Sequence, residues 1–225
     1  MPRYDSGLNG LRRLWLLLSN CLALLHVIAV GLCIGIPWSG WPWRLLTGMV
    51  VLYLAPPLAA RVIKTVFPIH EGHIALNTPE FFTWWILFNL QVIFCRLPAL
   101  EECLRLVPGL YSCWLRLWGA RVGRLTYWAA GLRILDRSFI RIGDNVVFGA
   151  DVRLNPHVLV RNEQNQMELI LATVAIGDRA MIGGYSLLTA GSEVAAGECT
   201  RAFLVSPPFG KWQDGRRTSK TDSAG

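Results

Sequence analysis

His157 is the residue whose type and position are best suited to chemistry. It is the only histidine after position 73, and it stands just before a polar interruption of a regular pattern. An imidazole has an ordinary pKa of about 6.5, so its neutral form can accept a proton near neutral pH. Nothing about folding requires a histidine at an outward-facing position. Two interpretations remain: a general base, or a surface residue of a catalytically inert repeat protein.

The pattern around His157 is a six-residue repeat in two in-phase blocks. An aliphatic or aromatic residue opens each clear unit, at Ile142, Phe148, Leu154, Ile176, Ile182, Leu188 and Val194. A small or aliphatic residue recurs at the fifth position, although Glu198 breaks this rule. A period of six is typical of a parallel β-coil with three flat faces, one unit per face, in which Gly or Asn takes the strained corner. Degenerate copies begin near Val122-Gly123 and at Leu132 or Ile134.

These repeats resemble those of the hexapeptide-repeat acyltransferases. The likeness extends to a membrane-anchored branch related to the carboxy-terminal domains of some nonribosomal peptide synthetases. Those proteins carry a phrase like residues 108–123 before the repeats, and the resemblance covers roughly residues 65–210. It implies a left-handed parallel β-helix, an exception to the usual right-handed crossover.

The resemblance also implies roles for individual residues. His157, at the edge of the excursion formed by 160–173, is the expected general base, and Asp136 matches a place where relatives carry an acidic residue. Asn155 would position substrate or orient the imidazole, although Asn155 and Asp136 could equally be corner residues bonded to the local backbone. Backbone amides near Gly183 and Gly184 would contact the thioester carbonyl or the pantetheine arm.

The first half of the chain is apolar enough to enter a membrane. The chain is 53% hydrophobic and 16% charged, against roughly a quarter charged residues in a soluble domain. Leu14 to Ile36 contains no formal charge, and about 20 apolar residues cross a bilayer core. A second uncharged run, Leu45 to Ala60, carries Pro56-Pro57 near its end. The segment Trp38 to Trp43 between the runs predicts a tight turn with aromatic rings at headgroup level.

Basic residues predict the orientation of the two runs. The outer ends carry Arg3, Arg12, Arg13, Arg61 and Lys64, and the turn holds only Arg44. Both outer ends are therefore expected in the cytoplasm, which predicts a multi-pass protein of the inner or plasma membrane with its repeat domain on the cytoplasmic side. A cleaved signal peptide is the competing interpretation of the first run, but the run exceeds the usual apolar core and lacks an Ala-x-Ala-like site.

The segment between these runs and the repeats predicts interfacial helices. Residues 81–95 are uncharged but short, which favours an interfacial or re-entrant segment. Residues 98–118 alternate apolar and charged side chains, as short amphipathic helices broken at Pro108-Gly109 would. Four domains follow: a transmembrane helical hairpin at 1–64, interfacial helices at 65–119, a left-handed β-helix acyltransferase domain at 120–206, and a basic disordered tail at 207–225.

Other functions are disfavoured by missing residues. The six cysteines show no paired spacing for a disulfide framework or a zinc site. The segment His70-Glu71-Gly72-His73 lacks the partner residue that a zinc-protease or glycerolipid-acyltransferase motif needs, so we interpret it as a polar juxtamembrane loop that could line an acceptor entry route. The repeats hold one histidine, whereas prism-shaped carbonic anhydrases need three. No basic stripe with interleaved aromatic residues predicts nucleic-acid binding.

The sequence therefore predicts an α + β protein with amino-terminal membrane helices followed by a β-helix. Its expected activity is transfer of an acyl group from acyl-CoA or an acyl carrier protein, as co-substrate and without a metal, to an amine or hydroxyl of a lipid-like acceptor. The alternatives are an inactive membrane-tethered scaffold and an O-acetyltransferase acting on a lipid-linked sugar. Expected partners are membrane lipids and a small-molecule or lipid acceptor, and the resemblance implies a homotrimer.

Overall fold

The computed structural model describes residues 10–218, which fall into two compact units. One unit contains residues up to His70 together with Ala75–Ile93, and the other contains Glu71–Ile74 and the chain from Phe94 onward. Arg3 of the predicted cytoplasmic end and residues 219–225 of the predicted tail lie outside the described residues.

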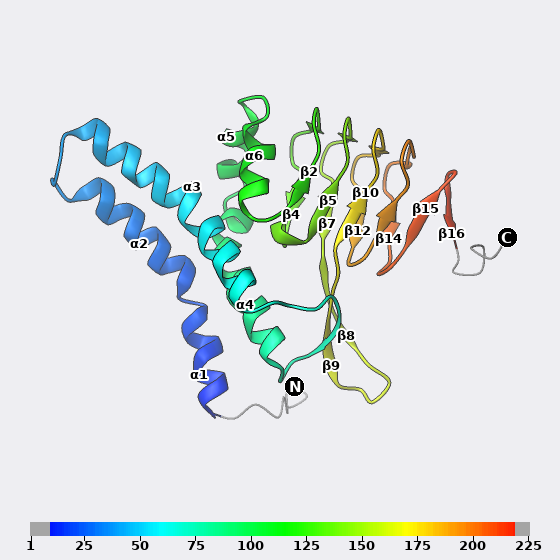
Figure 1. The fold of residues 1–225 in the computed structure, drawn as a ribbon, viewed down its shortest axis with the longest axis horizontal. Coiled ribbons are helices and arrows are strands. Elements are labelled where there is room, and N and C mark those ends of the chain that lie inside the picture. Colours follow the sequence, from blue (N-terminus) through cyan, green and yellow to red (C-terminus); the bar gives the residue numbers. More distant parts are fainter. Residues whose placement is uncertain (1–9, 219–225) are drawn as a thin grey trace. The chain divides into compact units, whose positions relative to one another are not determined.

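The first unit is helical. Its elements are α1 (Gly10–Ser19), α2 (Leu22–Gly35), α3 (Trp41–Val66) and most of α4 (Pro79–Arg96). Helices α2 and α3 form a hairpin (Figure 1), packed so closely that a Cβ on Gly48 would lie 2.6 Å from the Ile34 side chain. Two helical segments, Arg12–Gly35 and Trp41–Val66, are long and apolar enough to span a membrane, and a third span arises only if α4 is counted together with α5 (Ala99–Arg105).

Helix α3 differs from the expectation at its start. The predicted turn 38–43 ends early, because Trp41–Trp43 already form the first helical turn, with Pro42 at its beginning. Proline fits there because the first N–H groups of a helix have no partner within the helix. The helix also continues past Pro56 and Pro57, both buried, as far as Val66.

The second unit is a coil of parallel strands with three faces (Figure 1). The first sheet contains β2 (Arg121–Val122), β5 (Ile140–Ile142), β10 (Val174–Ile176), β13 (Glu193–Val194) and β15 (Lys211–Gln213). The second sheet contains β3 (Tyr127–Trp128), β6 (Val147–Phe148) and β11 (Met181–Ile182). The third sheet contains β4 (Arg133–Ile134), β7 (Arg153–Asn155), β12 (Leu187–Thr189) and β14 (Val205–Ser206). The chain passes through the three sheets in turn, as a six-residue period requires.

The side-chain pattern confirms the repeat. The first-position residues Ile142, Phe148, Leu154, Ile176, Ile182, Leu188 and Val194 are all buried, and Leu132 and Ile134 are buried in the earlier coil. The prediction that Gly or Asn takes the strained corner is only partly right. Asn145 does take a left-handed φ of 56°, but so do Tyr185 and Phe203, which are neither Gly nor Asn. Glycine is needed at the second position instead, because a Cβ on Gly149 would lie 2.5 Å from the backbone N of Gly184 in the next coil.

The interruption of the repeat is an antiparallel hairpin, β8 (His157–Arg161) and β9 (Met167–Leu171), which leaves the coil after β7 (Figure 1). This confirms the excursion, which begins a few residues earlier than the predicted 160–173. A third strand, β1 (Gly72–Ala75), pairs with β9.

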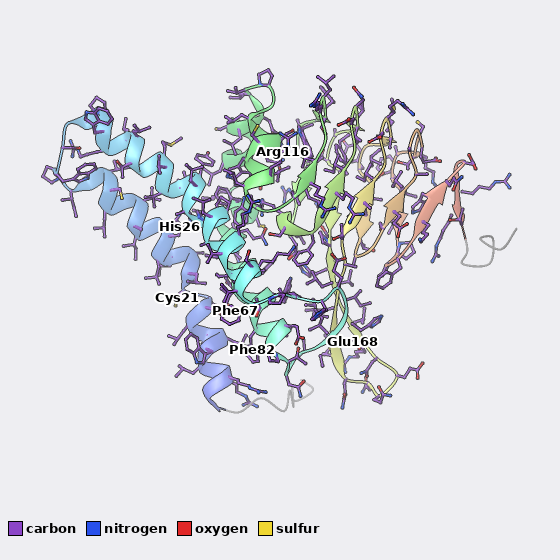
Figure 2. The ribbon with its side chains drawn as sticks, viewed as in Figure 1. Cys21, His26, Phe67, Phe82, Arg116 and Glu168 are labelled. Atoms are coloured by element: carbon purple, nitrogen blue, oxygen red, sulfur yellow. The ribbon has the colours of Figure 1, made fainter. Side chains whose placement is uncertain are left out.

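Two helices cover the first coil. They are α5 (Ala99–Arg105) and α6 (Leu110–Leu117), and the predicted break lies between them, where Gly109 takes a φ of 79°. Arg116 Nε of α6 donates to the Val122 carbonyl at 2.9 Å, and Trp128 Nε1 of β3 donates to Ser112 Oγ of α6 at 2.9 Å. Arg116 is labelled beside the first coil in Figure 2. The predicted interfacial role of α5 and α6 stays a prediction.

The prediction of a disordered tail at 207–225 is wrong for residues 211–218, which contain two strands. Strand β15 continues the first sheet, with Trp212 opposite Val194, and β16 (Arg216–Thr218) returns antiparallel to it. The physical reason is that Trp212 extends the inward-facing column, and its Nε1 donates to Ser206 Oγ at 2.8 Å. One more coil therefore forms after the last recognisable repeat.

Candidate active site

His157 and Asp136 form a hydrogen-bonded pair. His157 Nδ1 bonds to Asp136 Oδ2, and the two side chains are 15% and 2% exposed. A buried carboxylate on one ring nitrogen selects the tautomer in which Nδ1 carries the proton, so the lone pair resides on Nε2. The geometry therefore brings together two of the predicted site residues, although they are 21 positions apart.

The coil explains why these residues meet. Asp136 follows β4 and His157 follows β7, and these neighbouring strands of the third sheet pair in parallel with Ile134 opposite Leu154. Residues just beyond paired strand ends lie one above the other at a corner of the prism. The short helix η1 (Arg137–Phe139), which follows Asp136, is wholly buried.

The other predicted site residues lie elsewhere. Asn155 ends β7, two residues before His157, and it is half-buried on the wall of a small cavity. Gly183 and Gly184 follow β11, at the corner between the second and third sheets, whereas His157 lies at the corner after the third sheet. Close stacking accounts for Gly183, because a Cβ there would lie 2.4 Å from the Ala202 backbone N. A donor-binding role for these glycines stays a prediction.

A buried charge network next to Asp136 was not expected from the sequence. Glu101 of α5 is paired with Arg137, accepts a 3.1 Å bond from Arg105, and accepts a 2.5 Å bond from the Tyr111 hydroxyl. The side chains of Arg137, Glu101 and Arg105 are 1%, 5% and 6% exposed. The network ties α5 and α6 to the residue that follows Asp136. The sequence gives little signal of it, because Arg137 stands between the polar residues Asp136 and Ser138.

Burial and charge fix the protonation of this network. Burial and the adjacent Glu101 carboxylate raise the pKa of Tyr111 above its ordinary value, so the phenol remains a hydrogen-bond donor. Burial by itself lowers the pKa of Arg137, but the charge of Glu101 and the other neighbours outweigh it, and the net pKa is raised. Arg137 is therefore a permanent cation beside Glu101.

The segment with two histidines is bound to the hairpin. Glu71 accepts bonds from Thr173 N at 2.7 Å and Thr173 Oγ1 at 2.6 Å. His73 Nδ1 contacts Glu168 Oε1 of β9 at 2.7 Å, and Glu168 is labelled on the hairpin in Figure 2. Since Leu171 of β9 lies opposite His157 of β8, this segment supports the hairpin whose first residue is the candidate base.

Comparisons with known proteins give matches in structure alone. No family model and no curated protein matches the sequence. Two crystal structures of a hexapeptide-repeat-containing acetyltransferase from Vibrio cholerae are similar to this chain. One is 18% identical, covers 56% of this chain and 92% of that chain, and has a TM-score of 0.34. The other, complexed with acetyl-coenzyme A, is 16% identical, covers 58% and 87%, and has a TM-score of 0.40.

A maltose O-acetyltransferase from Clostridium difficile is also similar. It is 17% identical, covers 56% of this chain and 87% of that chain, and has a TM-score of 0.30. With TM-scores below 0.5, these similarities assign no function by themselves.

Proposed function

We propose that this chain is a membrane-bound acyltransferase. It would move an acyl group from acyl-CoA or an acyl carrier protein to an amine or hydroxyl of a lipid-like acceptor, with His157 as the general base. The observation that carries the proposal is the half-buried imidazole hydrogen-bonded through Nδ1 to a buried carboxylate. A residue that merely covers an inert repeat needs no buried anion on one chosen ring nitrogen.

The pair supports direct transfer in one active site. His157 Nε2 accepts the proton of the acceptor as its oxygen or nitrogen attacks the thioester carbonyl. A bond forms between the acceptor atom and the acyl carbon, and the negative charge moves to the carbonyl oxygen. When this intermediate collapses, the carbon–sulfur bond breaks and the thiolate takes the proton from the imidazolium. The products are an acylated acceptor and a free thiol, and the histidine returns to its neutral form.

Asp136 acts through His157 in this scheme. Its carboxylate holds the tautomer and stabilises the imidazolium that forms during attack. Asn155, two residues away from His157, would position the acceptor. Backbone amides near Gly183 and Gly184 would contact the donor. In a single chain these amides lie at a different corner of the coil from His157. The proposal is therefore that the donor binds between copies in a trimer.

The apolar helices give the proposal its setting. Two spanning helices suit a multi-pass protein of the inner or plasma membrane, and the flanking Arg and Lys residues favour a cytoplasmic repeat domain. That side is where acyl thioesters are made. The coil is proposed to be left-handed, as in the acyltransferases it resembles.

The experiment is a search for product. The full-length chain is reconstituted in lipid vesicles with labelled acyl-CoA of several chain lengths, and the extracted lipids are analysed by mass spectrometry. Wild-type protein should form a labelled product and release free thiol, and His157→Ala should lower the rate by at least about 100-fold. His26→Ala, which changes a histidine of α2, is the matched control. Equal product formation by His157→Ala and wild type would refute the base assignment, and no product from the wild-type protein would favour the scaffold alternative.

A further inference from the structure

A small cavity is lined by residues that lie next to Asp136 and two residues before His157 in the chain. Its volume is about 140 Å³, and its wall includes Leu135 and Arg137, which flank Asp136, together with Asn155. Pockets for whole ligands usually measure about 300–1,000 Å³, so this cavity fits one chemical group of a larger ligand. Asn155 and Arg153 of its wall lie two and four residues before His157.

Two arginines on the wall of this cavity have no counterion among the described residues 10–218. Arg133 and Arg153 are exposed and occupy directly opposed positions on β4 and β7 of the third sheet. Within residues 10–218, neither guanidinium has a hydrogen-bond or ion-pair partner. Like charges directly opposite on neighbouring strands are destabilising. A bound anion between Arg133 and Arg153 would compensate this repulsion and would explain why both charges are present at the cavity.

The acid on the cavity wall does not neutralise them. Glu101 is the acidic side chain among the lining residues, and it is already bound by Arg137, Arg105 and Tyr111. The excess charge at the cavity is therefore positive, and it comes from Arg133 and Arg153. Two forked guanidiniums match the oxygen atoms of a phosphate, which arginine binds through paired hydrogen bonds.

We propose that this cavity binds a phosphate group of the acyl acceptor, held by Arg133 and Arg153. The inference rests on the proposed function, and it specifies that the acceptor carries a phosphate group. Arg153 lies four residues before His157, at most about 13 Å along an extended chain, and Asn155 lies closer still. The phosphates of coenzyme A are separated from the thioester by the long pantetheine arm. A phosphate this close to the base therefore belongs to the acceptor and not to the donor.

Phosphate-bearing probes test the cavity directly. Full-length protein in a neutral detergent is titrated calorimetrically with inorganic phosphate, glycerol 3-phosphate, short-chain phosphatidylglycerol and, as uncharged counterparts, glycerol and short-chain diacylglycerol. Wild type should bind at least one phosphate probe and neither uncharged counterpart. Arg133→Gln/Arg153→Gln should weaken that binding by about 10-fold to 100-fold, since two charge-assisted contacts are lost. Preference for phosphatidylglycerol indicates a lipid headgroup, and preference for glycerol 3-phosphate indicates a soluble acceptor.

A second stacked pair supplies the matched control. Arg121 and Arg141 are opposed on β2 and β5 in the same way and are also exposed, but neither lines this cavity. Arg121→Gln/Arg141→Gln removes the same charge and should leave phosphate binding unchanged. Equal weakening by both double variants, or no binding of any phosphate probe by wild type, would overturn the proposal. Displacement of the bound phosphate probe by coenzyme A would also overturn it, because the cavity would then belong to the donor.

His157→Ala separates this inference from the proposed function. If the variant binds the phosphate probe like wild type and neither protein transfers an acyl group, the phosphate site stands and the proposed function fails. If acyl transfer depends on His157 but phosphate binding is insensitive to Arg133 and Arg153, the function stands and the phosphate site fails.

Discussion

Removing the charge of Glu101 should lower the unfolding free energy of the second unit more than any nearby single substitution. Glu101→Gln leaves the guanidiniums of Arg137 and Arg105, 1% and 6% exposed, without their shared anion. Breaking a buried ion pair by removing one partner costs about 3–5 kcal/mol. For a chain of this size, each kcal/mol lowers the melting temperature by about 2–4 °C, which predicts a loss of about 6–20 °C. The assay is thermal unfolding of detergent-solubilised protein followed by far-UV circular dichroism.

Two further variants decide whether burial of the charge is the cause. Glu102→Gln removes the adjacent carboxylate, which is 39% exposed and contacts Arg105 at 2.6 Å, and it should cost about 1 kcal/mol or less. Glu101→Gln/Arg137→Met also removes the most buried unpaired cation and should recover much of the lost stability. The reasoning fails if Glu102→Gln is as damaging as Glu101→Gln, or if the double variant is no more stable than the single one.

Three other predictions concern the frame around the site. The raised pKa of Tyr111 means that the unfolded chain loses its proton first, so stability should fall above about pH 10, and Tyr111→Phe should reduce this fall in denaturation measured against pH. Glu71→Ala should speed amide hydrogen exchange at Thr173, whose N–H donates to Glu71, and unchanged exchange would contradict the contact. Gly149→Ala should lower the melting temperature, at a cost of about 1–3 kcal/mol, because its Cβ meets the backbone of Gly184; a neutral result would contradict the coil spacing.

The repeat was predictable because every coil presents the same local environment. An inward first position recurs every six residues, so burial at Phe148 or Leu188 follows from spacing alone. Pairing of Asp136 with His157 was accessible for the same reason, since residues one coil apart meet at the same corner. The family resemblance then directed attention to these two.

Contacts between the coil and its covering helices were not predictable. Glu101 and Arg105 have the spacing of an exposed helical face, yet both are buried, and Glu101 is paired with Arg137 of the coil. The last coil was missed because the basic segment 207–225, taken as a whole with its Ser, Thr and Gly residues, has a composition typical of a disordered tail, although Trp212 lies opposite Val194 in the structure. The cavity beside Asn155 likewise needs the third sheet and residues from α4 and α5 together.

The most direct test of the central claim, that His157 and Asp136 act as one catalytic pair, is a double-mutant cycle on acyl-transfer rate. The rates of wild type, Asp136→Asn, His157→Ala and the double variant are measured with the same donor and acceptor in vesicles. We expect Asp136→Asn to slow transfer by about 100-fold to 10,000-fold, and the double variant to be no slower than His157→Ala, because Asp136 acts only through the imidazole. Independent losses that multiply in the double variant, or wild-type turnover by His157→Ala, would contradict the account.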